Sequence, residues 1–71
     1  MRNVETTQIS EGKATGLIFD ACRANEDRND WKNAEGYAVS FRLRTDGDYE
    51  AALRNPEGIV VALAVVDKFD C

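Results

Sequence analysis

Apolar and polar side chains alternate most clearly in residues 37 to 44, YAVSFRLR. This period of two predicts a half-buried strand. Residues 49 to 54, YEAALR, can alternate in the same way. A three-residue loop, Thr45-Asp46-Gly47, closed by a left-handed glycine, would bring both apolar sets onto one face. The predicted register sets Leu43 opposite Tyr49, Phe41 opposite Ala51, and Val39 opposite Leu53.

On the other face, this register predicts two cross-strand ion pairs, Arg44 with Asp48 and Arg42 with Glu50. A second loop of the same kind, Pro56-Glu57-Gly58, leads into the apolar run from Ile59 to Val66. That turn predicts a three-stranded meander in which Leu53 lies opposite Val61, Ala51 opposite Leu63, and Tyr49 opposite Val65. The helix propensity of EAAL favours a helix over residues 49 to 54 instead, and this is the competing interpretation.

An apolar sheet face needs a covering layer. Residues 10 to 25 are expected to supply it as a helix, because Ala14, Leu17, Ile18, Ala21 and Cys22 follow helical spacing, with Ser10 as the cap. A strand over GLIFDACR is the alternative. Residues 2 to 9 are expected to add a weak strand beside the third strand. The predicted fold class is α+β, one helix on a three- or four-stranded antiparallel meander in the order (β)αβββ, as a single domain over residues 1–71.

The predicted register turns part of the last strand toward the uncovered face of the sheet. Such a face is usually polar, and an exposed apolar strip tends to be used for contact. The sequence therefore suggests either coverage by the N-terminal segment or a surface for a partner or for homodimer formation, formed by Val60, Ala62, Ala64 and Val66.

Charge and composition narrow the classes of ligand. The formal charge is −4, which disfavours direct binding of nucleic acid or anionic membrane, because both are bound through basic patches. The apolar run is far shorter than the roughly 20 residues of a membrane span, and the N-terminus lacks the pattern of a signal peptide. A cytoplasmic location is expected. Cys22 and Cys71 are expected to be reduced thiols, with a Cys22–Cys71 bridge as the alternative.

Catalytic chemistry finds little support. The chain has no histidine, so the commonest general base and metal ligand is missing. Two isolated cysteines cannot form a four-thiolate zinc site, and no phosphate loop or dinucleotide motif is present. We therefore expect a protein that is not an enzyme and that needs no cofactor or metal.

Carboxylates and one tryptophan are the candidate contact residues. Residues 25 to 36, NEDRNDWKNAEG, are expected to form a polar connection without periodicity. An aromatic residue ringed by carboxylates suits a basic partner; the alternative is that Trp31 packs across the edge of the small core. The loop contributes Trp31, Glu26, Asp27, Asp30 and Glu35. The turns contribute a second set, Asp46, Asp48, Glu50 and Glu57.

Two resemblances add to this interpretation. In size, acidity and lack of catalytic residues, the whole chain resembles small phage-encoded inhibitors of host defence, among them anti-CRISPR proteins. The stretch EGYAVSFRLRTDGDYEAAL resembles the start of HicB-type antitoxins. The second resemblance implies a helix where the meander places its middle strand.

The sequence therefore predicts a non-enzymatic binding protein. Its leading form is a phage- or mobile-element-encoded inhibitor, anti-CRISPR-like, that docks on a basic, nucleic-acid-binding surface of a partner protein, such as a subunit of a CRISPR effector. The alternatives are an antitoxin-like protein that neutralises a basic ribonuclease and a homodimeric structural protein.

Overall fold

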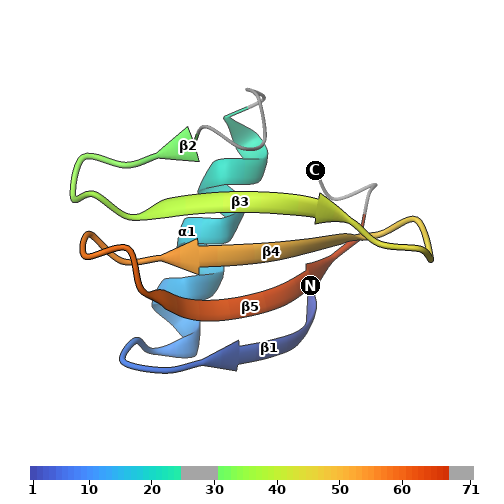
Figure 1. Cartoon of the computed structure of the whole chain (residues 1–71), viewed down its shortest axis with the longest axis horizontal. Helices are drawn as coiled ribbons and strands as arrows, with labels where there is room; N and C mark the ends of the chain where they lie inside the picture. Colours follow the sequence, from blue (N-terminus) through green and yellow to red (C-terminus); the bar gives the residue numbers. More distant parts are fainter. Residues whose placement is uncertain (25–30, 68–71) are drawn as a thin grey trace.

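The computed structural model describes residues 1–24 and 31–67. Their elements are β1 (Arg2–Thr6), α1 (Glu11–Arg23), β2 (Trp31–Lys32), β3 (Ala38–Leu43), β4 (Tyr49–Arg54) and β5 (Val60–Val66). The five strands form one antiparallel sheet in the order β1-β5-β4-β3-β2, and α1 crosses behind it in Figure 1. The expected α+β class is confirmed, with five strands in place of the three or four predicted.

The helix α1 begins where its cap was predicted. The Ser10 hydroxyl accepts a hydrogen bond from the backbone N–H of Lys13 at 3.2 Å, which satisfies one of the amides left unpaired in the first turn. The buried residues of the helix, Ala14, Leu17, Ile18 and Ala21, form one stripe at helical spacing. This stripe covers one face of the sheet, so the predicted helix is confirmed and the strand alternative over GLIFDACR is wrong.

Three hairpin turns of one design connect the meander. In each, the first residue donates its N–H to the carbonyl of the fifth, and a glycine in the fourth position donates back to the first. Gly36, Gly47 and Gly58 have φ angles of +97°, +93° and +85°, a conformation that favours glycine. The two predicted three-residue loops are therefore confirmed. The third, around Gly36, was not predicted.

The segment whose helix or strand character was ambiguous is strand β4. Its register with β3 is the predicted one: Leu43 pairs with Tyr49, Phe41 with Ala51, and Val39 with Leu53. Arg42 contacts Glu50 at 3.2 Å, as predicted. The residues that resemble the HicB-type pattern thus form a strand here, not the helix that the resemblance implies.

The register of β5 differs from the prediction because of a bulge. The turn itself is as predicted and pairs Arg54 with Val60, but the register shifts immediately afterwards, so that Leu53 pairs with Ala62. Val61 is the extra residue. As a result, the rest of the strand is turned over relative to the prediction. Ala62, Ala64 and Val66 face the helix, and Leu63 and Val65 face away.

The core lies between α1 and the covered face of β3, β4 and β5. Ile18, Leu53, Val39 and Val66 are its largest fully buried side chains. Leu43 belongs to the same face by register but is 63% exposed, since it is the last residue of β3, beside the turn. Among residues 1–24 and 31–67, no helix is long and apolar enough to span a membrane.

Cys22, at the end of α1, is disulfide-bonded. The sequence has one other cysteine, Cys71, which lies outside the described residues. The expectation of reduced thiols is therefore wrong for Cys22. Because disulfides are typical of oxidising compartments, this bond gives no support to the expected cytoplasmic location.

Candidate binding face

The candidate site is the face of the sheet opposite α1, and Figure 1 looks onto it. Cross-strand pairing arranges its side chains in three rows across the strands. The first row is Lys32, Ala38, Arg54 and Val60. The second is Ser40, Ala52, Leu63 and Glu5, and the third is Arg42, Glu50, Val65 and Arg2. We call this surface the open face.

The β2–β4 half of the open face is cationic. It carries Lys32, Arg42 and Arg54 against one carboxylate, Glu50. Arg42 contacts Glu50 through one nitrogen, and its side chain is 79% exposed. Neither Lys32 nor Arg54 forms an ion pair with any described residue. Excess positive charge therefore gathers on one surface of an acidic protein.

Small side chains make the middle row of this half a trough. Ser40 and Ala52 pair with each other at its floor, between the Arg54 row and the Arg42 row. The guanidinium of Arg54 donates a hydrogen bond to the Ser40 hydroxyl at 3.2 Å. The resulting hollow has a volume of about 330 Å³ and is lined by Ser40, Phe41, Arg42, Glu50, Ala52 and Arg54.

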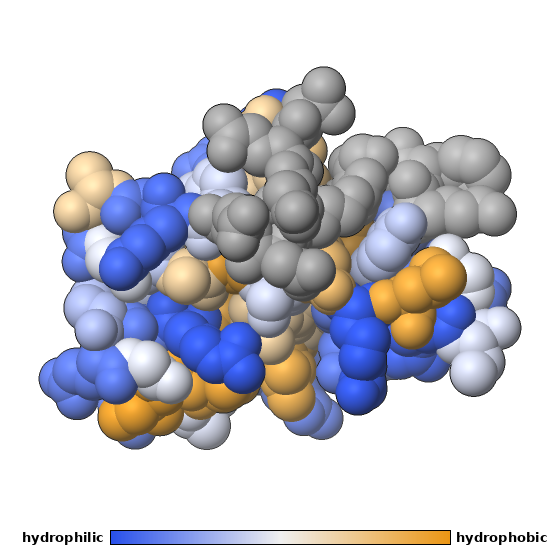
Figure 2. Space-filling view, turned by 45° about the horizontal axis from the view of Figure 1, so that its top comes forward, coloured by the Kyte–Doolittle hydropathy of each residue, from blue (hydrophilic) through white to orange (hydrophobic). Residues whose placement is uncertain are grey.

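An apolar strip borders the trough on the β5 side. Val60 and Leu63 are 39% and 38% exposed. Leu63 pairs with Ala52, so it continues the row that forms the trough floor. In Figure 2, hydrophobic surface and long hydrophilic side chains occur next to each other on the visible surface.

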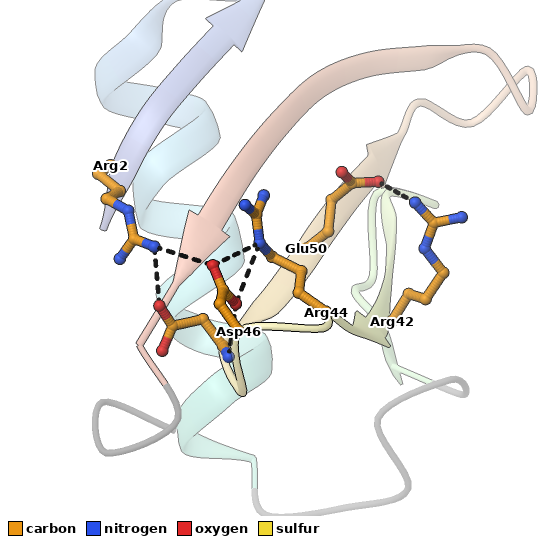
Figure 3. Close-up of polar contacts among 6 residues, drawn as sticks. Arg2, Arg42, Arg44, Asp46 and Glu50 are labelled. Carbon is orange, nitrogen blue, oxygen red and sulfur yellow. Dashed lines mark hydrogen bonds and ion pairs between the residues drawn. The ribbon is translucent and has the colours of Figure 1, made fainter.

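Near Gly47, the charged side chains of the open face pair with one another. Arg2 of β1 contacts Asp48 at 2.8 Å and Asp46 at 3.6 Å, and Arg44 contacts Asp46 at 3.2 Å (Figure 3). Arg2 pairs with Val65 in the sheet, and Val65 is nearly fully buried although it faces away from the helix. These ion pairs connect β1 to the β3–β4 turn.

The Asp46 carboxylate is held in its charged form. The backbone N–H of Asp48 donates a hydrogen bond to it at 3.0 Å. This bond is the main reason that the pKa of Asp46 lies below its usual value, and the positive charges of Arg44 and Arg2 lower it further. Arg44 was predicted to pair with Asp48. It pairs with Asp46 instead, and Asp48 pairs with Arg2.

The predicted acidic contact residues do not form one surface. Asp46, Asp48 and Glu50 are neutralised by arginines of the chain itself. Glu35 and Glu57 are both exposed and occupy the third position of their turns. These two turns lie against each other, because a Cβ atom added at Gly36 would lie 3.1 Å from Pro56. Glu35 lies 3.8 Å from Lys13. Glu26, Asp27 and Asp30 lie outside the described residues.

Trp31 lies in a strand, not in the polar connection predicted for residues 25 to 36. It pairs with Val39 as the first residue of β2, and its half-buried side chain packs against the core. The sequence offered a signal for this hairpin, because NAEG at Asn33–Gly36 repeats the pattern of NPEG at Asn55–Gly58. In both turns the asparagine side chain accepts hydrogen bonds from backbone amides.

The predicted partner strand also changes. Of Val60, Ala62, Ala64 and Val66, only Val60 is exposed, and the other three are buried beneath α1. The β5 bulge is the reason. Leu63 takes their place on the open face. The cationic residues Lys32, Arg42 and Arg54 were not predicted as contact residues, although the alternation of β3 already placed Arg42 and Ser40 away from the core.

Among residues 1–24 and 31–67, no group of three or more carboxylate or cysteine side chains is placed to hold a metal ion. The comparisons with protein-family models, curated proteins and solved structures found no match for the chain.

Proposed function

We propose that the protein is a non-enzymatic binding protein that acts by covering a surface of a partner protein with its open face. The single observation that carries this proposal is the one-sided architecture. The described residues place a helix over one face of the sheet and leave the other face with a cationic trough beside an apolar strip. Exposed apolar side chains next to arginines are a common composition for protein interfaces.

The stoichiometric mode of action rests on the side chains available. The trough offers guanidinium groups, a hydroxyl and methyl groups, and the chain has no histidine to move a proton near neutral pH. These groups can bind and orient a partner, but they include no base paired with a nucleophile. A protein of this kind works at a fixed ratio to its target.

An inhibitor of a nucleic-acid-binding protein is the second candidate function. The exposed carboxylates Glu35 and Glu57 favour it, because their touching turns present two negative charges at one end of the sheet. Exposed carboxylates can engage arginines and lysines that otherwise bind phosphates. In this mode the turns, not the open face, would contact the partner.

Parallel capture with two double variants separates these functions. Wild type, Arg42→Glu/Arg54→Glu and Glu35→Lys/Glu57→Lys serve as baits in extracts of the source organism. We expect a partner that is retained by wild type and by the turn variant but lost by the open-face variant. Native mass spectrometry of the purified complex should then give a fixed whole-number ratio.

Each contrary result has a definite meaning. A partner lost only by the turn variant would reject the open face and support the second candidate. A captured protein that binds all three baits equally would reject both surfaces. Catalytic turnover of the captured partner by substoichiometric protein would reject the non-enzymatic mode.

A further inference from the structure

The positive charge of the open face favours a negatively charged ligand. We propose that the trough binds an extended acidic segment of a partner protein that also carries an apolar side chain. This inference rests on the proposed function, since it names the partner class of the same face.

The first step is the position of the cations. Arg54 and Arg42 belong to rows that are four strand residues apart, a separation of about 13 Å along the strands. The trough between them is wide enough for one extended chain, whose strand-to-strand spacing is only about 5 Å when it lies in a sheet. Carboxylates on that chain would have a guanidinium on either side.

The second step is the availability of the donors. A guanidinium has five N–H donors in a fixed planar fork. Arg42 uses one nitrogen for Glu50, and Arg54 uses one for Ser40. The hydroxyl of Ser40 thus holds the head group of Arg54 at the trough floor, while the other donors of both arginines are available to carboxylates, the acceptors that best match this fork.

The third step is the apolar border. Leu63 continues the trough floor toward β5, and Val60 flanks it. An occupant that carried charge alone would leave both side chains in water, whereas a leucine or isoleucine in the acidic segment would cover them. Burial of such a side chain is favourable, so the strip can add both affinity and orientation.

A nucleic-acid strand fits this surface less well. Strand-binding proteins usually stack bases on aromatic side chains. The open-face positions of the described strands hold no aromatic residue, because Phe41, Tyr49 and Trp31 point to the covered side. The phosphate backbone also offers no apolar group for Leu63 and Val60. An acidic peptide satisfies both halves of the face.

The test uses a fluorescent, capped peptide composed of glutamate and leucine as the probe. Three comparison ligands accompany it: the same peptide with lysine for glutamate, the same peptide with alanine for leucine, and single-stranded oligouridylate. Binding is measured by fluorescence anisotropy. Amide chemical shifts of the ¹⁵N-labelled protein locate the contact.

We expect saturable binding of the glutamate–leucine peptide, weaker binding of the alanine version, and none of the lysine version. Shifts should concentrate at Ser40, Ala52 and Leu63. The variant Arg42→Glu/Arg54→Glu should weaken binding by about tenfold or more, since each exposed ion pair is worth up to about 1 kcal/mol and repulsion replaces it.

The variant Lys13→Glu/Arg23→Glu is the matched control, because it changes the net charge equally but lies on α1. It should leave binding within about twofold after salt screening. Arg42→Lys/Arg54→Lys keeps the charge and removes the planar fork, and it should give an intermediate loss. Far-ultraviolet circular dichroism confirms that each variant is folded before binding is measured.

Several results would overturn the proposal. These are equal binding of the lysine and glutamate peptides, shifts confined to α1, full affinity of the open-face variant, and displacement of the peptide by oligouridylate at lower concentration. Loss of a captured partner by the open-face variant, together with no binding of the acidic peptide, would retain the proposed function and reject only this partner class.

Discussion

The two faces of the sheet use alternate residues of the same strands for different purposes. On the covered face, Val39, Ala51 and Leu53 pack beneath α1 and are almost inaccessible to water. On the open face, the residues between them are Ser40, Ala52 and Arg54, and these form a shallow trough. The comparison teaches that stability depends on one set and the surface chemistry on the other, so each can change without the other.

The largest expected effect separates the faces with two leucines. Leu53→Ala removes a fully buried side chain from the covered face and should lower the free energy of unfolding by about 2–5 kcal/mol. Leu63→Ala on the open face, where the side chain is 38% exposed, should cost less than about 1 kcal/mol. Urea denaturation followed by tryptophan fluorescence measures both. Equal losses would show that the open face is part of the core.

A second prediction concerns the turns, which belong to neither face. Gly36→Ala should lower stability by about 1–3 kcal/mol, because its φ of +97° disfavours a side chain. The new Cβ would also lie 3.1 Å from Pro56. Gly58→Ala is the matched control, since its φ of +85° is similar but a Cβ there meets nothing within 4 Å. Gly36→Ala should therefore have the lower thermal midpoint, and the reverse order would contradict the contact between the turns.

The β3–β4 hairpin was predictable, and the start of β5 was not, for a physical reason. In YAVSFRLR the alternation fixes which side chains are buried, and the glycine-closed turn fixes the register. The run Val60–Val66 is apolar throughout. Its pattern is compatible with either face, so a one-residue bulge at Val61 inverts the strand without any sign in the sequence.

The candidate site was missed for a related reason. Arg42 was assigned to a cross-strand pair with Glu50, and that pair exists. The net charge of the open face, however, depends on all five strands and cannot be read from one hairpin. Lys32 joins that face only because residues 31–32 form β2. The repeated NAEG and NPEG patterns were the available signal for this hairpin.

A third prediction checks that the open face contributes little to folding. Arg42→Ala and Arg54→Ala should each change the free energy of unfolding by less than about 0.5 kcal/mol, because exposed ion pairs and surface substitutions have small effects. Chemical denaturation of each variant measures this change. A loss above about 1 kcal/mol would mean that these arginines stabilise the sheet, a role that needs no partner.

The smallest expected effect concerns the end of the open face that is closed by ion pairs. The folded-state pKa of Asp46 is lowered, chiefly by the hydrogen bond from the Asp48 amide. A lowered pKa contributes stability that is fully present above the unfolded value of 3.8 and is lost as the pH falls through the folded value. Asp46→Asn should therefore make stability fall less steeply below about pH 4.

Glu57→Gln is the control, because Glu57 occupies the same turn position and has no ion pair with any described residue. It should leave the loss of stability at acid pH unchanged. Thermal denaturation between about pH 2 and pH 6 measures both. Parallel profiles for wild type and Asp46→Asn would show that the hydrogen bond from the Asp48 amide and the contacts with Arg44 and Arg2 do not lower the pKa of Asp46 in solution.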